Sequence, residues 1–454
     1  MSIQTAFAHF TAKSALHLMR LAGRRGSQLT GAIALHLDPH FVESIKKPER
    51  ILSITGTNGK TTTSNLIGDM LKQLGHTYIH NNNGSNTKRG IASSFANQEP
   101  LFGPGPSYAV LEQDELWFRR FREAYTPRTL TVTNLYQDSI DRNANIQYIF
   151  QRINEGIHEE TTLILNASDS ISAYLGTDAN RRVYFNVQPL EGEVPCTDSK
   201  IQDMIYCPQC GRPIVWDFKR YHHIGRYHCD HCGFTNPPAD YEAYARNIAL
   251  GTLQLRDHGQ EVVLPLIQSA VENIYNEVAA YATLRENGFS IHEVLGALSQ
   301  IQITASRYEE STMGEKRIIS VVSKGNNPVA TSRIFYNIKN TEGPRTVIYL
   351  TDDERPDLNH TCPGWIFMSD FAYLKDVDQV IFMTKYAGNA QFTAVLDGVP
   401  PERIHIADHL EQIPDQIDPQ RRETIFILHD IEDYTQNMAR ELIAQLRRRI
   451  GGNQ

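Results

Sequence analysis

The sequence predicts an α/β protein with a parallel-sheet domain that binds phosphate, an inserted zinc ribbon and a second α/β domain at the C-terminal end. Three observations indicate this organisation. A glycine-rich turn separates an apolar strand from a helix at 51–74, two Cys-x-x-Cys pairs lie within 207–232, and apolar strands alternate with helical segments from 317 onwards. We expect a helical arm over 1–46, a central domain over 47–305 with the ribbon at about 200–238, and a C-terminal domain over 306–454.

The composition narrows the class of protein. The chain has 454 residues, with 52 acidic against 44 Lys and Arg residues and a net charge of −8, so it does not bind polyanions as a whole. No apolar run approaches the ~20 residues that cross a bilayer, and six cysteines are too few for a disulfide-stapled secreted protein. We therefore expect a cytoplasmic protein of about two or three domains without a transmembrane segment.

The N-terminal segment is basic and contains no acidic residue before Asp38. An amphipathic, acid-poor segment is typical of an organellar transit peptide, but it can equally be a helix that docks on the protein. We favour the docking helix, because basic residues are few and Gly23 can end the helix. Its apolar residues lie roughly on one face: Phe7, Phe10, Leu16, Met19 and Leu21.

The turn after residues 51–54 has the pattern of a P-loop. The apolar run is suited to a buried strand, and Leu66, Met70 and Leu74 repeat at helical spacing beyond the turn. In such a turn backbone N–H groups approach phosphate oxygens, a lysine reaches the β- and γ-phosphates, and a hydroxyl ligates Mg²⁺. Ile54 stands where the general pattern has its first glycine. The predicted phosphate-binding residues are Gly56, Thr57, Asn58, Gly59, Lys60, Thr61 and Thr62, with Thr61 as the Mg²⁺ ligand.

Polar residues follow three further predicted strands, at 108–111, 130–133 and 162–165. We expect these strands to form a parallel sheet with a site along the edge where they end. Glu112, directly after the first of them, is well placed to hold Mg²⁺ beside the P-loop. An exposed acidic turn is the alternative interpretation of Glu112.

Four of the six cysteines form two pairs, Cys207/Cys210 and Cys229/Cys232, separated by eighteen residues. This spacing is typical of a four-thiolate zinc site, and because no position is left for water the zinc is expected to be structural. A pair of disulfides or a dithiol redox centre is the alternative, which a cytoplasmic location disfavours. Four nearby histidines could replace a ligand, although we interpret them as neighbours of the site: His222, His223, His228 and His231.

The segment 270–285 predicts a helix with Asn273 and Asn276 one turn apart near its start. Asparagine there can cap the helix, or its amide can face a nucleotide base. The alternation of strands and helices after 316 predicts a Rossmann-like α/β domain. We expect its strands at 317–322, 346–350, 379–383, 403–406 and 424–428, and its last helix at about 433–449.

Together these motifs resemble the Mur ligase superfamily. The matching segments are Gly-Thr-Asn-Gly-Lys-Thr at 56–61, Val-Leu-Glu-x-Asp-Glu at 110–115, Asn-Leu-x-x-Asp-x-x-Asp-Arg at 134–142 and Tyr-Asn-x-x-Ala-Ala at 275–280. The inserted ribbon and the short arm, in place of a full N-terminal domain, are similar to one subfamily that amidates a cell-wall precursor. The resemblance implies an ATP-dependent carbon–nitrogen ligase of peptidoglycan biosynthesis that uses Mg²⁺ and structural Zn²⁺.

The resemblance also implies the reaction. In that subfamily ATP phosphorylates the α-carboxylate of D-glutamate in the lipid II stem peptide, and ammonia from a GatD-type glutaminase subunit attacks the acyl phosphate. This implies a heterodimer that acts at the cytoplasmic face of the membrane. Lys60, Glu112 and Mg²⁺ would neutralise the transferring phosphoryl group. Asn276 would contact adenine, and Arg307 would meet the phosphates.

The C-terminal domain departs from the family pattern. Ser306 replaces the glycine before Arg307, and Lys324-Gly-Asn-Asn-Pro-Val lacks a following glycine. Asp357 is the candidate for an aspartate that completes the catalytic triad of the glutaminase partner. Its spacing to Trp365 is longer than in the family.

Two other functions fit the residues. One is a stand-alone Mur-type ligase that adds an amino acid instead of ammonia, for which a full N-terminal substrate domain is expected. The other is a zinc-ribbon nucleic-acid-binding ATPase. Asp217, Asp230 and the net charge of −8 count against the second function, so we expect no nucleic-acid partner. The basic residues that suggest it are Lys200, Arg212, Lys219, Arg220 and Arg226.

Overall fold

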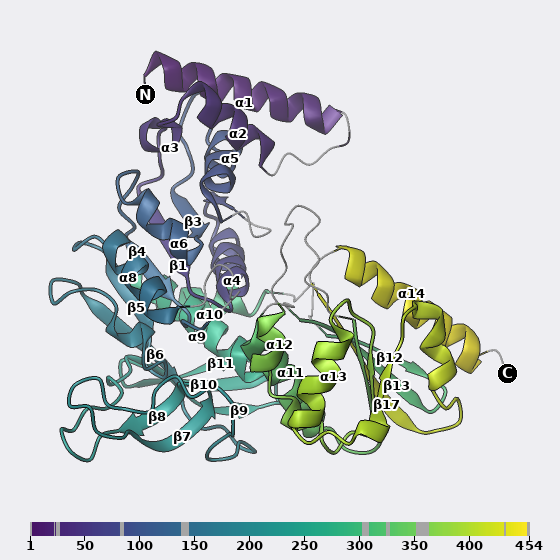
Figure 1. The fold of residues 1–454 in the computed structure, drawn as a ribbon. Helices are drawn as coiled ribbons and strands as arrows, with labels where there is room; N and C mark the ends of the chain where they lie inside the picture. The colour runs from purple at the N-terminus through teal and green to yellow at the C-terminus, as the bar shows by residue number, and fades with distance from the viewer. Residues whose placement is uncertain are drawn as a thin grey trace. The chain divides into compact units, whose positions relative to one another are not determined.

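The computed structural model of the chain divides into two compact units (Figure 1). The N-terminal unit comprises Met1–Tyr136, Ile146–Asp198 and Gln202–Gln302, and the C-terminal unit comprises Gln137–Asn145, Ser199–Ile201 and Ile303–Gln454. The structure describes residues 2–21, 23, 28–81, 86–137, 145–301, 308–323, 327–350, 363–430 and 433–451.

A nine-stranded sheet forms the centre of the N-terminal unit, in the order β11-β10-β9-β6-β5-β4-β1-β3-β2. The strands from β2 to β9 in this order pair in parallel, whereas β9, β10 and β11 are antiparallel. The four strands predicted before residue 170 are present as β1, β3, β4 and β5, and the other five were not predicted. The bounds are β1 Arg50–Thr55, β2 Tyr78–His80, β3 Tyr108–Glu112, β4 Thr129–Val132, β5 Thr162–Asn166, β6 Arg182–Val187, β9 Tyr241–Asn247, β10 Thr252–Asp257 and β11 Gln260–Pro265.

Helices cover both faces of this sheet, because its central strands are apolar on both sides. One face packs on α1 (Ile3–Leu21), α2 (Leu29–Leu37), α3 (Phe41–Ser44), α5 (Lys88–Gln98), α6 (Glu115–Phe118) and α8 (Ile146–Gly156). The other face carries α4 (Lys60–Gln73), α9 (Val271–Glu286) and α10 (Ile291–Leu298). β4 illustrates the alternation: Leu130 and Val132 join the first side, while the Thr131 hydroxyl bonds that of Thr283 on α9 at 2.7 Å.

The N-terminal helix differs from its predicted arrangement. Leu16 is buried as expected, but Phe7, Phe10 and Leu21 are exposed, so the predicted single apolar face is wrong. The buried face consists mainly of small or polar residues: Thr5, Ala8, His9, Ala12 and Leu16. Small side chains allow α1 to pack closely against its neighbours. None of the described helices is long and apolar enough to cross a membrane.

The inserted ribbon is a two-stranded antiparallel hairpin between β6 and β9, formed by β7 (Val215–Tyr221) and β8 (Ile224–His228). Arg220 anchors it to the body of the N-terminal unit. This guanidinium is buried and bonds both carboxylate oxygens of Glu193, at 2.7 and 2.5 Å, and the backbone oxygens of Val187 and Gln188. Each nitrogen of this buried guanidinium donates a hydrogen bond. These bonds fix the hairpin to the end of β6.

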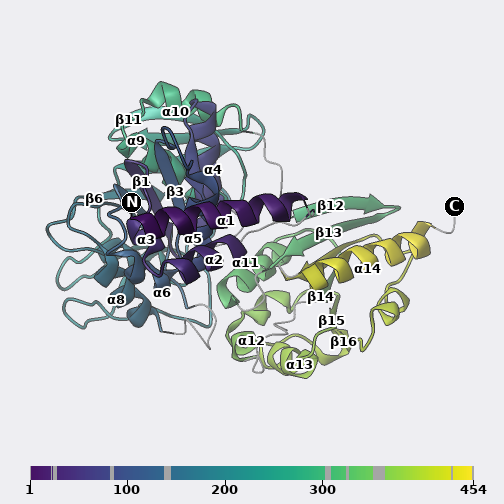
Figure 2. The same cartoon turned by 90° about the horizontal axis from the view of Figure 1, so that it is seen from above.

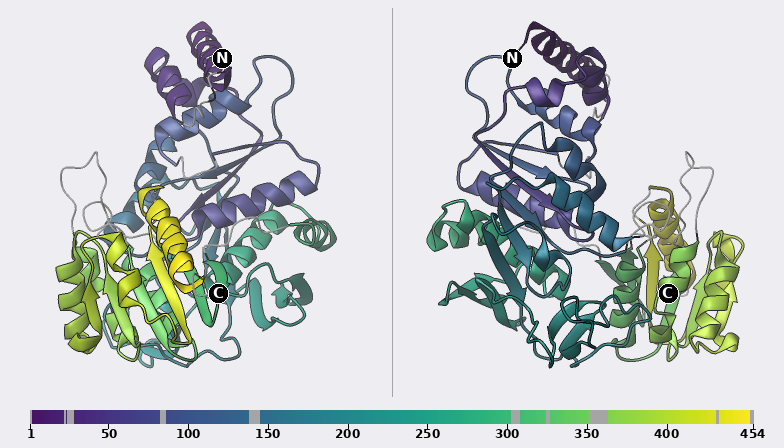
Figure 3. Two further views of the ribbon diagram at one scale, coloured as in Figure 1. Left: turned by 90° about the vertical axis from the view of Figure 1, so that its right-hand side faces the viewer. Right: turned by 60° about the vertical axis from the view of Figure 1, so that its left-hand side comes forward.

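The C-terminal unit contains a six-stranded sheet in the order β12-β13-β17-β14-β15-β16, parallel except for the β12–β13 pair. Helix α14 covers one face of this sheet, and α11, α12 and α13 cover the other (Figures 2 and 3). An apolar cluster lies on each face, beneath these helices. The five predicted strands and the last helix are present; β12 was not predicted. The bounds are β12 Tyr308–Met313, β13 Lys316–Val322, β14 Arg345–Tyr349, β15 Gln379–Phe382, β16 Ile404–Ile406, β17 Glu423–His429, α11 Pro328–Lys339, α12 Gly364–Met368, α13 Ala387–Leu396 and α14 Asp433–Gly451.

Candidate active site and metal centre

The P-loop has the close contacts that a phosphate-binding turn requires. Gly56 and Gly59 adopt φ values of 125° and 87°, and Gly59 is the N-cap of α4. A Cβ at Gly56 would lie 2.3 Å from the Thr133 hydroxyl, and one at Gly59 would lie 2.1 Å from the amide oxygen of Asn276. Only glycine fits positions that combine positive φ with such approach. The turn is therefore wedged between the end of β4 and helix α9.

The segment after β4 holds the P-loop by reciprocal hydrogen bonds. Asn58 N–H donates to the Asn134 side-chain oxygen at 2.9 Å, and the Asn134 amide donates to the Asn58 carbonyl at 3.0 Å. The Thr57 hydroxyl accepts from the backbone N–H of Tyr136 at 2.9 Å. These bonds fix the turn in one conformation, so its remaining N–H groups do not have to be ordered when phosphate binds.

Lys60, the first residue of α4, forms an ion pair with Glu115 at 2.9 Å. Its ammonium group also donates to the backbone carbonyl of Gly56. Burial raises the pKa of Glu115, and the Lys60 charge opposes that shift. These two contacts hold the Lys60 side chain over the glycine turn, where phosphate would bind.

Thr61 and Glu112 meet, as the predicted Mg²⁺ site requires. The Thr61 hydroxyl donates to Glu112 Oε2 at 2.8 Å, and the Asn86 amide donates to Glu112 Oε1 at 3.2 Å. Asn81 bonds both the N–H and the carbonyl of Glu112, at 2.8 and 2.6 Å. Glu112 is buried, so the alternative of an exposed acidic turn is wrong. A hydroxyl and a carboxylate oxygen are ligands that Mg²⁺ accepts.

The structure describes some of the remaining predicted site residues and leaves others outside the described part of the chain. Asn276 lies in α9 with its amide against Gly59, and the N-cap of that helix is Ala270, so neither Asn273 nor Asn276 caps it. Thr62 continues the first turn of α4. Arg307 and Asp357 lie outside the described residues, as do Asp138, Asp141 and Arg142 of the third motif.

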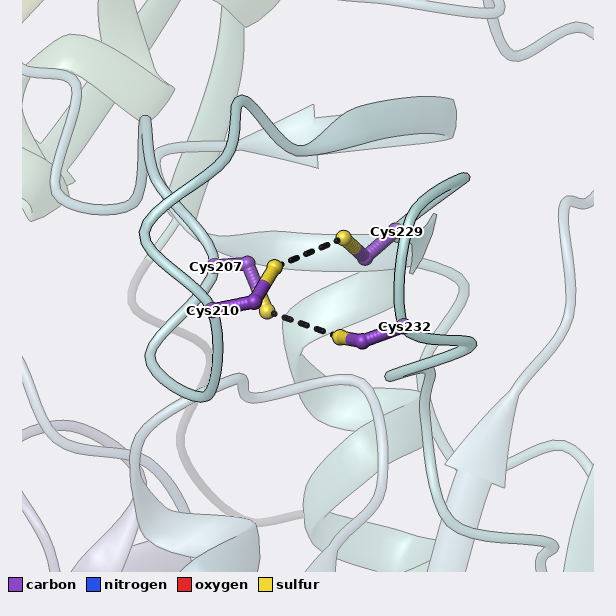
Figure 4. Close-up of side chains that lie close together, drawn as sticks. All are labelled: Cys207, Cys210, Cys229 and Cys232. Atoms are coloured by element: carbon purple, nitrogen blue, oxygen red, sulfur yellow. Dashed lines mark hydrogen bonds between the residues drawn. The ribbon is translucent and has the colours of Figure 1, made fainter.

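The four cysteines converge on one point in the ribbon (Figure 4). All four sulfurs lie within 4.8 Å of one another, and the Cys207–Cys232 and Cys210–Cys229 sulfurs are 3.5 Å apart. Tetrahedral thiolates around an ion with 2.3 Å bonds are about 3.8 Å apart, whereas a disulfide bond measures about 2.05 Å. The predicted cluster is therefore present, all four of its cysteines are free, and the disulfide alternative is wrong.

Each pair of cysteines lies in the same kind of turn. Gly211 N–H donates to the Cys207 carbonyl and Gly233 N–H to the Cys229 carbonyl, both at 2.9 Å. The two glycines have φ values of 71° and 74°. These repeated turns bring the sulfurs together from opposite sides of the hairpin, which is the geometry of a site for one tetrahedral ion.

The electrostatics of the cluster favour a bound cation. The backbone N–H of Cys232 lowers the pKa of Cys229 to about 6. The N–H of Phe234 favours the Cys232 thiolate, but burial and the other sulfurs outweigh it and raise the pKa of Cys232 to about 12. Four thiolates this close repel one another, and a divalent cation removes that repulsion.

The turn of the hairpin carries a second buried cluster, at His222 and His223. His223 has no exposed surface; its Nδ1 lies 2.9 Å from Asp203 Oδ2, and its Nε2 lies 3.2 Å from Asp169 Oδ1, close enough for an ion pair. Burial alone would lower the pKa of His223, but Asp169 and Asp203 outweigh burial and raise it to about 10. His222, in the turn between β7 and β8, adopts a φ of 46°, in a region that histidine enters more readily than most residues.

Asp169 joins this cluster to the nucleotide side of the unit. Its other oxygen accepts from the backbone N–H of Leu135 at 2.8 Å, and the next residue, Tyr136, bonds Thr57 of the P-loop. The Tyr136 and His223 rings are 5.0 Å apart. The hairpin is thus connected to the P-loop through a short series of buried contacts.

Sequence reasoning missed two parts of this arrangement. Glu115 is the last residue of the motif at 110–115, but no role was predicted for it. Asp203 has no recognisable signal in the local sequence, because its partner His223 lies in another part of the insertion. His222 and His223 were interpreted as neighbours of the metal site, and the cysteine cluster that the described residues form includes no histidine.

Lys60→Ala is expected to lower ATP turnover by at least about 100-fold, because it removes the cation beside the transferring phosphoryl group. The chain should still fold with a modest loss of stability, because the side chain of Lys60 is only 11% exposed and its removal leaves the buried Glu115 without a cation. ATP hydrolysis and thermal unfolding would be measured for this variant and for Lys72→Ala, an exposed lysine on the same helix. Equal turnover in the two variants would refute the role of Lys60.

Cys207→Ser is expected to lose the metal ion and to lower the unfolding temperature, because three thiolates hold a structural ion less well than four. Metal content and unfolding would be compared with Cys196→Ser, an exposed cysteine outside the cluster. The wild type and the control should carry about one equivalent of metal per chain. A metal-free wild type would contradict the site.

His223→Asn is expected to lower the free energy of unfolding by about 3 kcal/mol near pH 6, because it leaves two buried carboxylates without their cation. The folded-state pKa of about 10 lies above the ordinary 6.5, so this contribution is complete below about pH 6.5 and is lost as the pH rises towards 10. Denaturant unfolding at several pH values would test this, with exposed His36→Asn as control. A stability difference that does not shrink with rising pH would contradict it.

Comparisons with known proteins agree with this geometry. The Mur ligase middle domain matches residues 54–189. The chain is 31% identical over 371 residues to lipid II isoglutaminyl synthase (glutamine-hydrolyzing) subunit MurT of Staphylococcus aureus, with 80% of this chain and 82% of that protein covered. It is 28% identical over 436 residues to the subunit of the same name from Streptococcus pneumoniae, with 94% and 95% covered.

Solved structures show the same fold. A pseudomurein peptide ligase type C from Methanothermus fervidus superposes with a TM-score of 0.66 at 20% identity, covering 90% of this chain and 81% of that one. The sequence identity to the staphylococcal subunit extends over most of both chains. The chain therefore belongs to the Mur ligase superfamily of ATP-dependent ligases and, within it, to the MurT family.

Proposed function

We propose that this chain is the ligase subunit of a lipid II isoglutaminyl synthase. The observation that supports this most directly is a four-cysteine ribbon inside a unit that also carries the Mur-type P-loop. The relatives that match at least 80% of the chain are named for lipid II and for glutamine hydrolysis. The acceptor would be the α-carboxylate of D-glutamate in the stem peptide, and the product D-isoglutamine.

In the first step a carboxylate oxygen of the acceptor attacks the γ-phosphorus of ATP, the bond to ADP breaks, and an acyl phosphate forms. Lys60 would exchange Glu115 for the β- and γ-phosphate oxygens. Glu115 is suited to this exchange because burial raises its pKa, so it can take up a proton when the ammonium leaves. The ordered N–H groups of the turn would hold the phosphates.

Thr61 and Glu112 would hold Mg²⁺, which supplies charge neutralisation at the phosphates. Asn81 and Asn86 keep the Glu112 carboxylate in place. Asn276, whose amide lies against Gly59, would contact adenine. Arg307 would meet the phosphates. We propose that the central domain ends, and the C-terminal domain begins, at about residue 305.

In the second step the nitrogen of ammonia attacks the acyl carbon, the nitrogen loses a proton, and phosphate leaves. A GatD-type glutaminase would supply the ammonia in a heterodimer, with Asp357 completing its catalytic triad. The reaction would take place in the cytoplasm at the membrane face, where the head group of lipid II is accessible. The chain's own contribution is to hold the acyl phosphate away from water until ammonia arrives.

The ion in the ribbon would be Zn²⁺, because four closely placed thiolates in a tetrahedral arrangement select zinc. Its role would be structural, since the four cysteines leave no open coordination position. A nucleic-acid role for the ribbon has little support. Two of its five basic residues, Lys219 and Arg220, are buried, and Lys200 pairs with Asp397 at 2.6 Å within the C-terminal unit.

Incorporation of nitrogen tests the proposal. The full chain would be incubated with ATP, Mg²⁺ and detergent-solubilised lipid II, together with ammonium, glutamine, or glutamine plus a GatD-type glutaminase. We expect amidated lipid II with ammonium alone, and with glutamine only when the glutaminase is present. Lys60→Ala should give no product in any mixture.

Two outcomes would contradict the proposal. If the chain adds a free amino acid to the precursor and does not add ammonia, it is a stand-alone peptide ligase. A salt-dependent shift of single-stranded nucleic acid that stimulates ATP hydrolysis would identify a nucleic-acid-dependent ATPase.

A further inference from the structure

Helix α1 has an exposed apolar stripe that the function above does not use. Five large apolar side chains on it have exposed fractions between 58% and 92%. Successive members are separated by whole turns of the helix, so they line one side of it. They are Ile3, Phe7, Phe10, Leu18 and Leu21. Exposed apolar residues that gather in this way mark an interaction surface, whereas scattered ones do not.

The opposite side of α1 is fixed to the N-terminal unit. The Thr5 hydroxyl donates to Asp38 Oδ2 at 2.7 Å, and His9 Nε2 lies 3.1 Å from the Ala96 carbonyl at the end of α5. Ala8 and Ala12 are fully buried between these contacts. α1 lies along α2 and α5 (Figures 1 and 3). The exposed residues of the stripe lie on the other side of the helix from its buried residues. The stripe is therefore held outward and is not the face of a loose terminal helix.

The charged side chains of α1 itself are all basic. α1 contains no acidic residue, and Lys13, His17 and Arg20 lie at the side of the stripe. Arg24 and Arg25 follow in the sequence. The first carboxylate of the chain, Asp38, is buried and engaged by Thr5; Glu99, at the end of α5, attracts Lys13. A surface of opposite charge is the complementary partner.

We propose that α1 docks in the interface of an anionic phospholipid membrane, with the stripe among the acyl-chain ends and the basic residues at the head groups. This rests on the proposed function only in that a lipid-linked substrate places the reaction at such a surface. The 19 residues of α1 make a straight ridge about 28 Å long. One row of side chains is too narrow for the ~800 Å² per partner of a stable protein interface, but it fits a fluid layer.

Flotation with lipid vesicles tests the proposal. The full chain would be mixed with vesicles of phosphatidylcholine alone or with added phosphatidylglycerol. We expect binding to the mixed vesicles that weakens with salt, and little binding to phosphatidylcholine. The double variant Phe7→Ser with Phe10→Ser should bind about tenfold more weakly, because two side chains that enter the interface are lost.

The matched control is Ile248→Ser with Leu250→Ser, which removes two equally exposed apolar residues from the turn between β9 and β10. It should bind like the wild type. Unfolding temperatures of both variants should stay close to that of the wild type, because all four residues are exposed.

Equal binding of the two double variants, or absence of wild-type binding to anionic vesicles, would overturn the proposal. Loss of glutaminase binding by the α1 variant, with no vesicle binding by the wild type, would instead make the stripe a protein interface.

Amidation of a water-soluble substrate analogue separates this test from the proposed function. If the proposed function fails, no variant amidates the analogue; if only membrane docking fails, the analogue is amidated and the vesicles are not bound.

Discussion

One buried carboxylate, that of Asp169, holds three parts of the N-terminal unit together. It accepts N–H groups from the start of the segment that follows β5, at Ile171 and Ser172, and from Leu135 in the segment that follows β4. It also faces His223 of the ribbon. Burial on its own would raise the pKa of Asp169, but His223 and these N–H groups hold it below the ordinary range. A buried charge of this kind is stable only while all of its partners are in place.

Through this constraint the cysteine ribbon could affect the P-loop without taking part in the chemistry there. The ion would fix the two cysteine turns, the hairpin between them carries His222 and His223 at its tip, and His223 fixes Asp169. From Asp169 the contacts continue through Leu135 and Tyr136 to the P-loop. A structural ion is well suited to this task because it adds to the small apolar cluster of the ribbon around Tyr227 and Phe234.

Protein contacts order the P-loop. Asn134 bonds Asn58 in both directions, and Lys60 is held by Glu115 over the turn. Phosphoryl transfer depends mainly on positioning and charge neutralisation, so such order lowers the cost of binding phosphate. In the same unit, the two faces of α1 serve different purposes in our account: the face of small and polar residues packs on the protein, and the apolar face docks on a membrane surface.

The sequence by itself determined the elements whose signals are local. Strands β1, β3, β4 and β5, the glycine turn, helix α9 and the two cysteine turns follow from short apolar runs, positive-φ glycines and fixed spacing, and the five parallel strands of the C-terminal unit were predicted in the same way. The meeting of Thr61 with Glu112 was also predictable, because the ends of parallel strands share one edge of a sheet.

Only the tertiary structure decided the contacts between segments that are distant in the sequence. It paired Lys60 with Glu115, placed Asn276 against Gly59 and placed His223 between Asp169 and Asp203. It also reversed the expectation for α1, burying alanines and exposing phenylalanines. Periodicity identifies an amphipathic helix, but which side is buried depends on the neighbouring surface. Close packing against α2 and α5 selected the small residues.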